Sequence, residues 1–213
     1  MCFSAEASII SYIIGTISSL YLLINGDKYD KQIGLFCLVF VQMQLLEFFM
    51  WIDQSCQNTN YYASILVNLI LLLQPLSIII GAILFKTTSI PSILLILCLI
   101  LNLIITILTI YQISNNKKNL CSKHINNGYL EWDNINKITN LEYILYFLFM
   151  FIIWPFMKNK KGLIVFIFGI ISLLFGMNNG LKFNFAQWES KWCFFSVSLP
   201  VIIILYNKFI KYK

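Results

Sequence analysis

A single acidic residue stands deep inside an apolar stretch of this sequence, VQMQLLEFFMWIDQ. Gln44, Glu47 and Trp51 are spaced three and four residues apart, so a helix places them on one face. A carboxylate that faces lipid is costly, so Glu47 should face the interior of a helical bundle. There it suits proton transfer, which makes Glu47 a candidate catalytic acid or base. The alternative is a buried Glu that holds neighbouring helices together by hydrogen bonds.

Other candidate side chains stand near the ends of apolar runs. His124, the only histidine, is the second candidate for proton transfer, against the alternative of a solvated loop residue. Ser190 and Cys193 are nucleophilic types, but the sequence shows no activating base for either. Trp188 and Trp192 have the spacing of anchors at a membrane surface, and the alternative is that they line the mouth of a pocket. The candidate ligand-binding residues are Ser4, Gln44, Trp51, Gln74, Asn179, Trp188 and Trp192.

The composition indicates which class of protein must position these side chains. The chain is 59% hydrophobic and 11% charged, whereas soluble domains carry about 25% charged residues. We therefore expect an integral membrane protein with one polytopic domain over 1–213. The net charge of +6 comes from lysines at the ends of apolar segments, which indicates interfacial anchors. We expect membrane lipids and no nucleic acid as partners, and assembly into a homo-oligomer stays open.

Seven apolar segments reach the length of about 20 residues that a helix needs to cross a bilayer. The sequence thus predicts an all-α membrane protein, a bundle of about seven transmembrane helices. The longest connection, 113–139, exceeds the usual length of a loop and is either functional or mobile. The predicted spans are 5–24, 33–52, 62–85, 90–112, 140–157, 162–180 and 192–209.

The distribution of lysine predicts the orientation of the chain. Short loops rich in lysine face the cytosol, and the lysines gather in the first, third and fifth loops and at the C-terminus. We therefore expect the N-terminus outside or in a lumen and the C-terminus in the cytosol. The loop 113–139 is then non-cytosolic.

The cysteines follow the same topology. Four of the six fall at the predicted non-cytosolic face, where an oxidising compartment permits two disulfides in any of three pairings. We expect at least one pair with a Cα separation below about 7 Å, against the alternative of chance scatter. The sequence has no Cys-x-x-Cys pair and one histidine, so we predict no metal site. The disulfide candidates are Cys2, Cys56, Cys121 and Cys193.

Polar residues gather in the outer halves of the predicted spans, whereas the inner halves are nearly all Ile, Leu, Phe and Val. Gln42, Gln74 and Asn102 lie near mid-depth and need partners, because hydrocarbon offers no hydrogen bonds. This distribution predicts a cup that is open to the outside and closed below, with Glu47 facing it. It argues against a continuous polar pore.

Three short motifs resemble those of an uncharacterised family of small multi-pass membrane proteins. They are the start Met-Cys-Phe-Ser, the pair Gln44-x-x-Glu47 followed by Trp51, and the late pair Trp192-Cys193. The family typically begins Cys-Phe-Ser or Cys-Trp-Ser, carries His-Gln-x-x-Glu in the second span and ends with a late Trp-Cys. Here Met43 stands where the family has histidine, so a ligand or base at that position is missing. The resemblance supplies no activity but implies one site formed by Cys2, Ser4, Glu47, Trp51, Trp192 and Cys193.

Three classes of function stay open. The first is a membrane-embedded enzyme that acts on a lipid or small amphiphile, with Glu47 as acid or base and, to replace the absent histidine, His124. The second is a ligand-binding or structural protein without chemistry. The third is a channel or transporter formed by oligomerisation, which the apolar inner halves disfavour. No cofactor is indicated, and a retinal protein is excluded because Lys191 and Lys208 flank the last span instead of lying within it.

Overall fold

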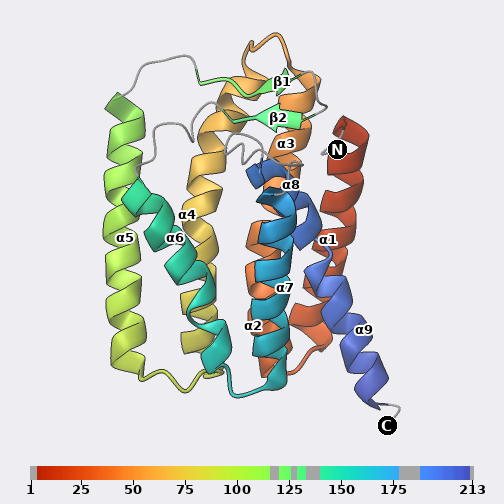
Figure 1. Cartoon of the computed structure of the whole chain (residues 1–213), viewed down its shortest axis with the longest axis vertical. Coiled ribbons are helices and arrows are strands. Elements are labelled where there is room, and N and C mark those ends of the chain that lie inside the picture. The colour runs from red at the N-terminus through yellow and green to blue at the C-terminus, as the bar shows by residue number, and fades with distance from the viewer. Residues whose placement is uncertain (1–3, 116–119, 126–128, 133–139, 178–187, 212–213) are drawn as a thin grey trace.

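The computed structural model describes residues 4–115, 120–125, 129–132, 140–177 and 188–211, and these form a bundle that the chain crosses seven times (Figure 1). The predicted all-α bundle is confirmed, and five crossings are long and apolar enough to span a membrane. The protein is an integral membrane protein. The helices are α1 (Ala5–Asn25), α2 (Lys28–Phe40), α3 (Gln42–Ile52), α4 (Thr59–Phe85), α5 (Ser92–Asn115), α6 (Asn140–Phe151) with the 3-10 turn η2 (Trp154–Phe156), α7 (Lys160–Met177), α8 (Trp188–Ser196) and α9 (Leu199–Lys211).

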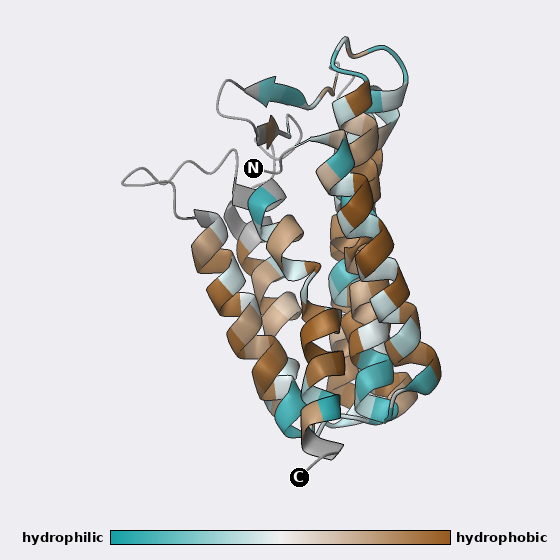
Figure 2. Cartoon of the chain, turned by 90° about the vertical axis from the view of Figure 1, so that its right-hand side faces the viewer, coloured by the Kyte–Doolittle hydropathy of each residue, from teal (hydrophilic) through white to brown (hydrophobic). Residues whose placement is uncertain are grey.

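The surface of the bundle matches a lipid environment. Ile17 and Ile24 of α1 and Ile107 of α5 are more than half exposed, and aliphatic side chains of this kind belong in hydrocarbon rather than water. Hydrophilic residues gather toward the two ends of the bundle (Figure 2). Inside, Phe36 of α2 meets Trp154 of η2 edge to face at 5.4 Å between ring centroids.

Two crossings are broken into pairs of helices near the middle of the bundle. α2 and α3 meet at Val41, and α8 and α9 are separated by Val197 and Ser198. Gly15 of α1 faces both breaks, since a Cβ built on it would come within 2.6 Å of Val41 Cγ2 and 2.7 Å of Val197 Cγ1. Only glycine lets α1 approach this closely.

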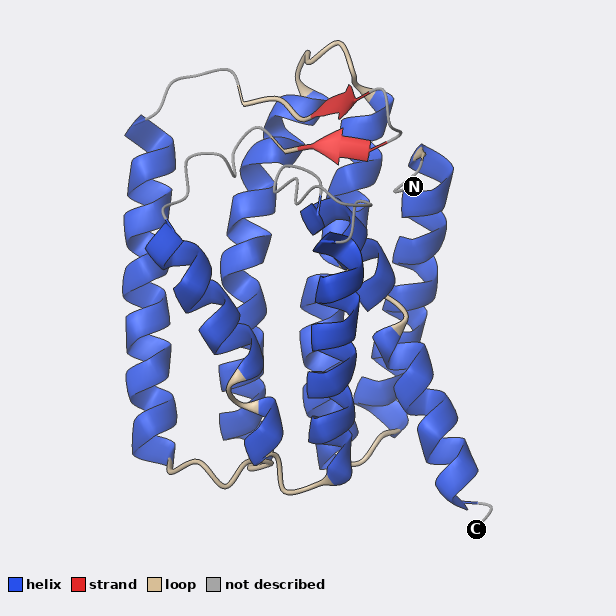
Figure 3. Ribbon diagram, viewed as in Figure 1, coloured by secondary structure: helices blue, strands red, loops and turns tan. Residues whose placement is uncertain are grey.

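We call one end of the bundle the disulfide end. It carries the Cys56–Cys121 disulfide, with a Cα separation of 5.9 Å, which confirms the prediction of at least one bonded pair. The antiparallel strands β1 (Lys123–Ile125) and β2 (Tyr129–Glu131) lie beside it, and Figure 3 shows no other strand in the described part of the chain. α1 begins at this end (Figure 1). The segment 113–139 thus starts as the last turn of α5 and later includes this hairpin.

We call the opposite end the lysine end, where α1 turns into α2, α7 begins and α9 ends (Figure 1). Asp27 caps α2 in a reciprocal box with Asp30, whose carboxylate accepts the backbone N–H of Asp27. Gly26 makes this turn because a Cβ there would lie 2.4 Å from the Leu22 carbonyl oxygen. α2 therefore starts five residues before the predicted span, and its first turn adds charged residues to the bundle.

Candidate functional site

Glu47 and Gln44 form a buried pair on α3. Neither has any exposed surface, and Gln44 Nε2 donates to Glu47 Oε2 at 2.8 Å. The predicted common face is therefore present, and the amide holds the carboxyl group in place. The amide oxygen of Gln44, Oε1, is buried and has no hydrogen-bond partner among the described residues.

Trp51 continues this face one turn above Glu47, toward the disulfide end. Its indole N–H is buried and unpartnered within the described ranges. The ring of His124 packs against Trp51 with 5.2 Å between centroids, and the His124 backbone N–H donates to Gln54 Oε1 at 2.8 Å. The imidazole itself is exposed. The structure thus brings together Trp51 and His124, which the sequence predicted separately.

A network that the sequence analysis missed holds the loop at the disulfide end. Asn60 Nδ2 donates to the carbonyls of Asp53 and Ser122 at 2.9 and 2.8 Å, and Asn60 Oδ1 accepts the backbone N–H of Ser122. The hydroxyls of Ser64 and Ser122 lie 2.9 Å apart. The spacing of Asn60, Ser64 and Asn68, four residues each, is the signal that could have found this face of α4.

Asp53 ends α3 and holds the start of α4. Its carboxylate accepts the backbone N–H groups of Asn60 and Gln57 at 3.0 and 3.2 Å. The hydrogen bond from the backbone N–H of Asn60 is the largest cause that keeps the pKa of Asp53 below its ordinary value, and burial acts the other way without cancelling it. Asp53 is therefore a charged anchor for the backbone at neutral pH.

Two of the predicted ligand-binding residues join helices inside the bundle. The Tyr146 hydroxyl of α6 donates to Gln74 Oε1 of α4. Trp192 of α8 is 3% exposed, and its Nε1 donates to Ser172 Oγ of α7 at 3.1 Å. Trp192 also meets Phe40 edge to face at 5.6 Å. The prediction that Trp192 anchors the chain at a membrane surface is wrong, because its ring is buried in the core of the bundle.

The remaining predicted residues are scattered. The Ser4 side chain accepts the backbone N–H of Ala7 and caps α1. Cys193 is buried in α8. Cys2, Asn179 and the Trp188 side chain lie outside the described residues. Two cavities lined by described residues do not include Glu47, so the cup around Glu47 stays a prediction.

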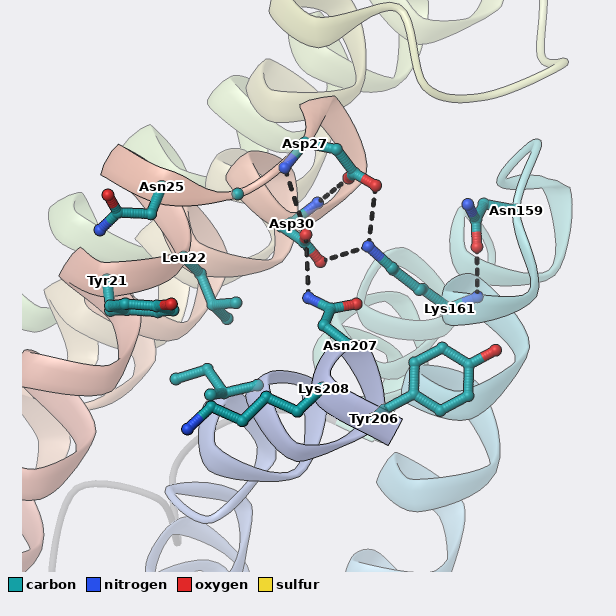
Figure 4. Close-up of a pocket in the computed structure, with 12 residues that line it drawn as sticks. Tyr21, Leu22, Asn25, Asp27, Asp30, Asn159, Lys161, Tyr206, Asn207 and Lys208 are labelled. Atoms are coloured by element: carbon teal, nitrogen blue, oxygen red, sulfur yellow. Dashed lines mark hydrogen bonds and ion pairs between the residues drawn. The ribbon is translucent and has the colours of Figure 1, made fainter. Parts of the chain in front are cut away.

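A charged cluster at the lysine end was also missed. Lys161 Nζ of α7 lies 2.9 Å from Asp27 Oδ2 and 2.7 Å from Asp30 Oδ1 (Figure 4). Asn207 Nδ2 of α9 donates to Asp30 Oδ2 at 3.0 Å. Gln32, which has no exposed surface, accepts the Thr87 hydroxyl nearby. All of these residues except Asn207 lie outside the predicted spans, so the apolar inner halves of the spans gave no signal of this cluster.

Comparison of the chain with known proteins finds no relative. No protein-family model, no curated protein and no solved structure matches the chain. The fold and the composition define the class, a polytopic integral membrane protein. The resemblance to an uncharacterised family stays a prediction from the three motifs.

Proposed function

We propose that the protein binds a lipid or small amphiphile at the disulfide end, with Glu47 at the centre of the site. Support comes from two buried polar atoms on the same face of α3. Gln44 Oε1 and Trp51 Nε1 lie on either side of Glu47 along the helix, and neither has a partner in the described part of the chain. An unmet buried polar group costs about 1–3 kcal/mol.

The chemistry of these atoms defines the ligand. Gln44 Oε1 needs a donor, and the Trp51 N–H needs an acceptor. Hydroxyl, amide and carboxyl groups can pair with either atom, and the apolar side chains of α3 suit the attached hydrocarbon. The occupant that fits is therefore an amphiphile with a small hydrogen-bonding head.

A second candidate function is acid–base chemistry on such an amphiphile. The packing of His124 against Trp51 favours it, since Trp51 lies about one helical turn from Glu47 and the two ring centroids of Trp51 and His124 are 5.2 Å apart. In this role Glu47 transfers the proton and His124 exchanges it with water. A channel formed by several subunits is the remaining alternative, and no observation favours it.

We also propose that the disulfide end is extracellular or lumenal and that the C-terminus is cytosolic. Disulfides persist in oxidising compartments, and Cys56–Cys121 lies at the end where α1 begins. The lysine-rich short loops lie at the other end, as cytosolic loops do. Two independent signals therefore agree on one orientation.

The test is lipid retained by the purified protein, measured by native mass spectrometry. Gln44→Leu and Glu47→Gln should each lower the retained amphiphile at least about tenfold, the effect of one lost hydrogen bond to a buried group. Gln42→Leu is the matched control, because Gln42 lies in the same helix and bonds the Leu38 carbonyl instead. Retention that is equal in all four proteins would leave Glu47 as a structural residue.

The acid–base candidate has its own test, with the retained amphiphile as substrate. Glu47→Gln should abolish turnover while the melting temperature stays within a few degrees of the wild-type value. His124→Gln should lower turnover and shift its pH profile. A protein that binds the amphiphile and never converts it would exclude the enzyme and keep the binding function.

A further inference from the structure

A cavity lies at the lysine end, far from Glu47 and unused by the proposed function. Its volume is about 620 Å³, and four segments enclose it: the end of α1, the start of α2, the start of α7 and the end of α9. Leu22 and Ile204 give it apolar walls, while Tyr21 and Tyr206 add phenol groups. The cavity therefore combines apolar and polar surfaces at one end of the bundle, where the helices long enough to span a membrane begin or end.

The charges of Asp27, Asp30 and Lys161, which line the cavity, do not sum to zero. Lys161 and Asp30 are 6% and 3% exposed and neutralise each other as a buried ion pair. Lys161 also holds Asp27, whose side chain is 51% exposed. Two carboxylates thus share one ammonium group, and the three side chains carry a surplus of one negative charge.

Asp27 keeps that charge at neutral pH. Partial burial disfavours the ionised form, but the bond and charge of Lys161 and the backbone N–H groups of Asp30 and Tyr29 outweigh it and lower the pKa of Asp27. Lys208 lines the same cavity, but its ammonium group points away from Asp27 and Asp30 (Figure 4). The surplus charge is therefore left for a cation in the cavity.

We propose that this cavity binds the headgroup of a phospholipid that carries a primary ammonium group. The ammonium group donates to the exposed edge of Asp27, and Lys208 pairs with the phosphate. The two centres of opposite charge match a zwitterionic headgroup, and the apolar walls receive the first part of the glycerol and acyl region. A free amine shares the ammonium chemistry but lacks the phosphate and the hydrocarbon.

The test uses the full-length chain, purified in detergent, freed of lipid and titrated by native mass spectrometry. Phospholipids with identical acyl chains and ethanolamine, choline or glycerol headgroups are compared with free ethanolamine. The ethanolamine lipid should bind at least about tenfold more tightly than the others, as expected for a charge-assisted hydrogen bond. Equal affinity for the choline lipid would overturn the ammonium assignment. Equal affinity for free ethanolamine would overturn the lipid as its source.

Two variants locate the site. Asp27→Asn removes the surplus charge but keeps an oxygen that can accept the backbone N–H groups of Tyr29 and Asp30, so the cap of α2 survives. Asp27→Asn should weaken binding of the ethanolamine lipid at least about tenfold. Glu6→Gln, an exposed acid at the other end, is the matched control and should change nothing. Unchanged binding in Asp27→Asn would overturn the site.

Lys208→Met tests the phosphate contact without touching the ion pair. Lys208 is exposed, so the melting temperature should not change. The affinity for the ethanolamine lipid should fall about threefold to tenfold, and that for free ethanolamine should stay the same. Equal losses for both ligands would contradict the proposed division of the headgroup between Asp27 and Lys208.

Discussion

The two ends of the bundle bury acidic groups in different ways. At the lysine end, Asp30 meets the opposite charge of Lys161, which comes from a helix 131 residues further along the chain. At the disulfide end, Glu47 receives a hydrogen bond from the neutral amide of Gln44 in its own helix. An opposite charge keeps a buried carboxylate such as Asp30 ionised, and its removal leaves an uncompensated buried charge. We expect the ion pair to fix the fold at the lysine end and the Gln44–Glu47 pair to serve the proposed binding site at the disulfide end.

The largest effect is expected from loss of the lysine. Lys161→Met leaves Asp30 buried without its cation, which should lower the free energy of unfolding by about 3–5 kcal/mol. Thermal or denaturant unfolding in detergent measures it, and Lys160→Met is the control, because Lys160 is exposed. Similar stabilities for the two variants would show that the ion pair contributes no net stability.

The second-largest effect on stability is expected from loss of the Cys56–Cys121 disulfide. It closes a loop with a sequence separation of 65, so its loss should lower the free energy of unfolding by about 2–4 kcal/mol. The paired variant Cys56→Ala/Cys121→Ala and a reducing agent should give the same shift in melting temperature. Cys98→Ala is the control, and a wild-type protein that is insensitive to reduction would contradict this expectation.

Local signals in the sequence account for the part of the fold that was predicted. A membrane span needs a run of about 20 apolar residues, and such a run is visible in the sequence. All seven crossings therefore coincide with predicted segments. The break at Val41 has no proline or glycine to mark it. Gly15 of another helix lies against it, and only the folded structure shows this contact.

The site was predicted in part for a similar reason. The face that carries Gln44, Glu47 and Trp51 follows from helical spacing alone. The pairing of Lys161 with Asp30 could not be read in the same way, because a lysine at a helix end looks like every other interfacial lysine. The prediction for Trp192 was wrong for the same kind of reason, since the sequence does not show which way a ring near a helix end points.

A matched exchange of acid for amide sharpens the comparison. Glu47→Gln keeps an oxygen that can accept from Gln44, so the free energy of unfolding should change by less than about 1 kcal/mol. Asp30→Asn removes the negative charge that pairs with Lys161, so it should lower the free energy of unfolding by more, about 1–3 kcal/mol. Unfolding of both variants under one condition measures the difference. A larger loss from Glu47→Gln would reverse the roles of the two ends.

The smallest effect concerns two acids at the surfaces of the two ends. The pKa values of Asp27 and Asp53 both lie below the ordinary value of 3.8. Each therefore contributes stability that is fully present above that pH and is lost as the pH falls through the lowered pKa. The causes differ. Lys161 supplies charge to Asp27, whereas backbone N–H groups hold Asp53.

Titration of the two carboxyl groups by NMR, with labelled aspartate, separates these causes. In Lys161→Met the pKa of Asp27 should rise, because burial then acts against fewer favourable contacts, and the pKa of Asp53 should stay the same. Added salt should raise the pKa of Asp27 more than that of Asp53, since salt screens the charge of a partly exposed pair but not hydrogen bonds within a turn. Equal responses would mean that the lysine end and the disulfide end hold their surface acids by one mechanism, which would remove the contrast between them.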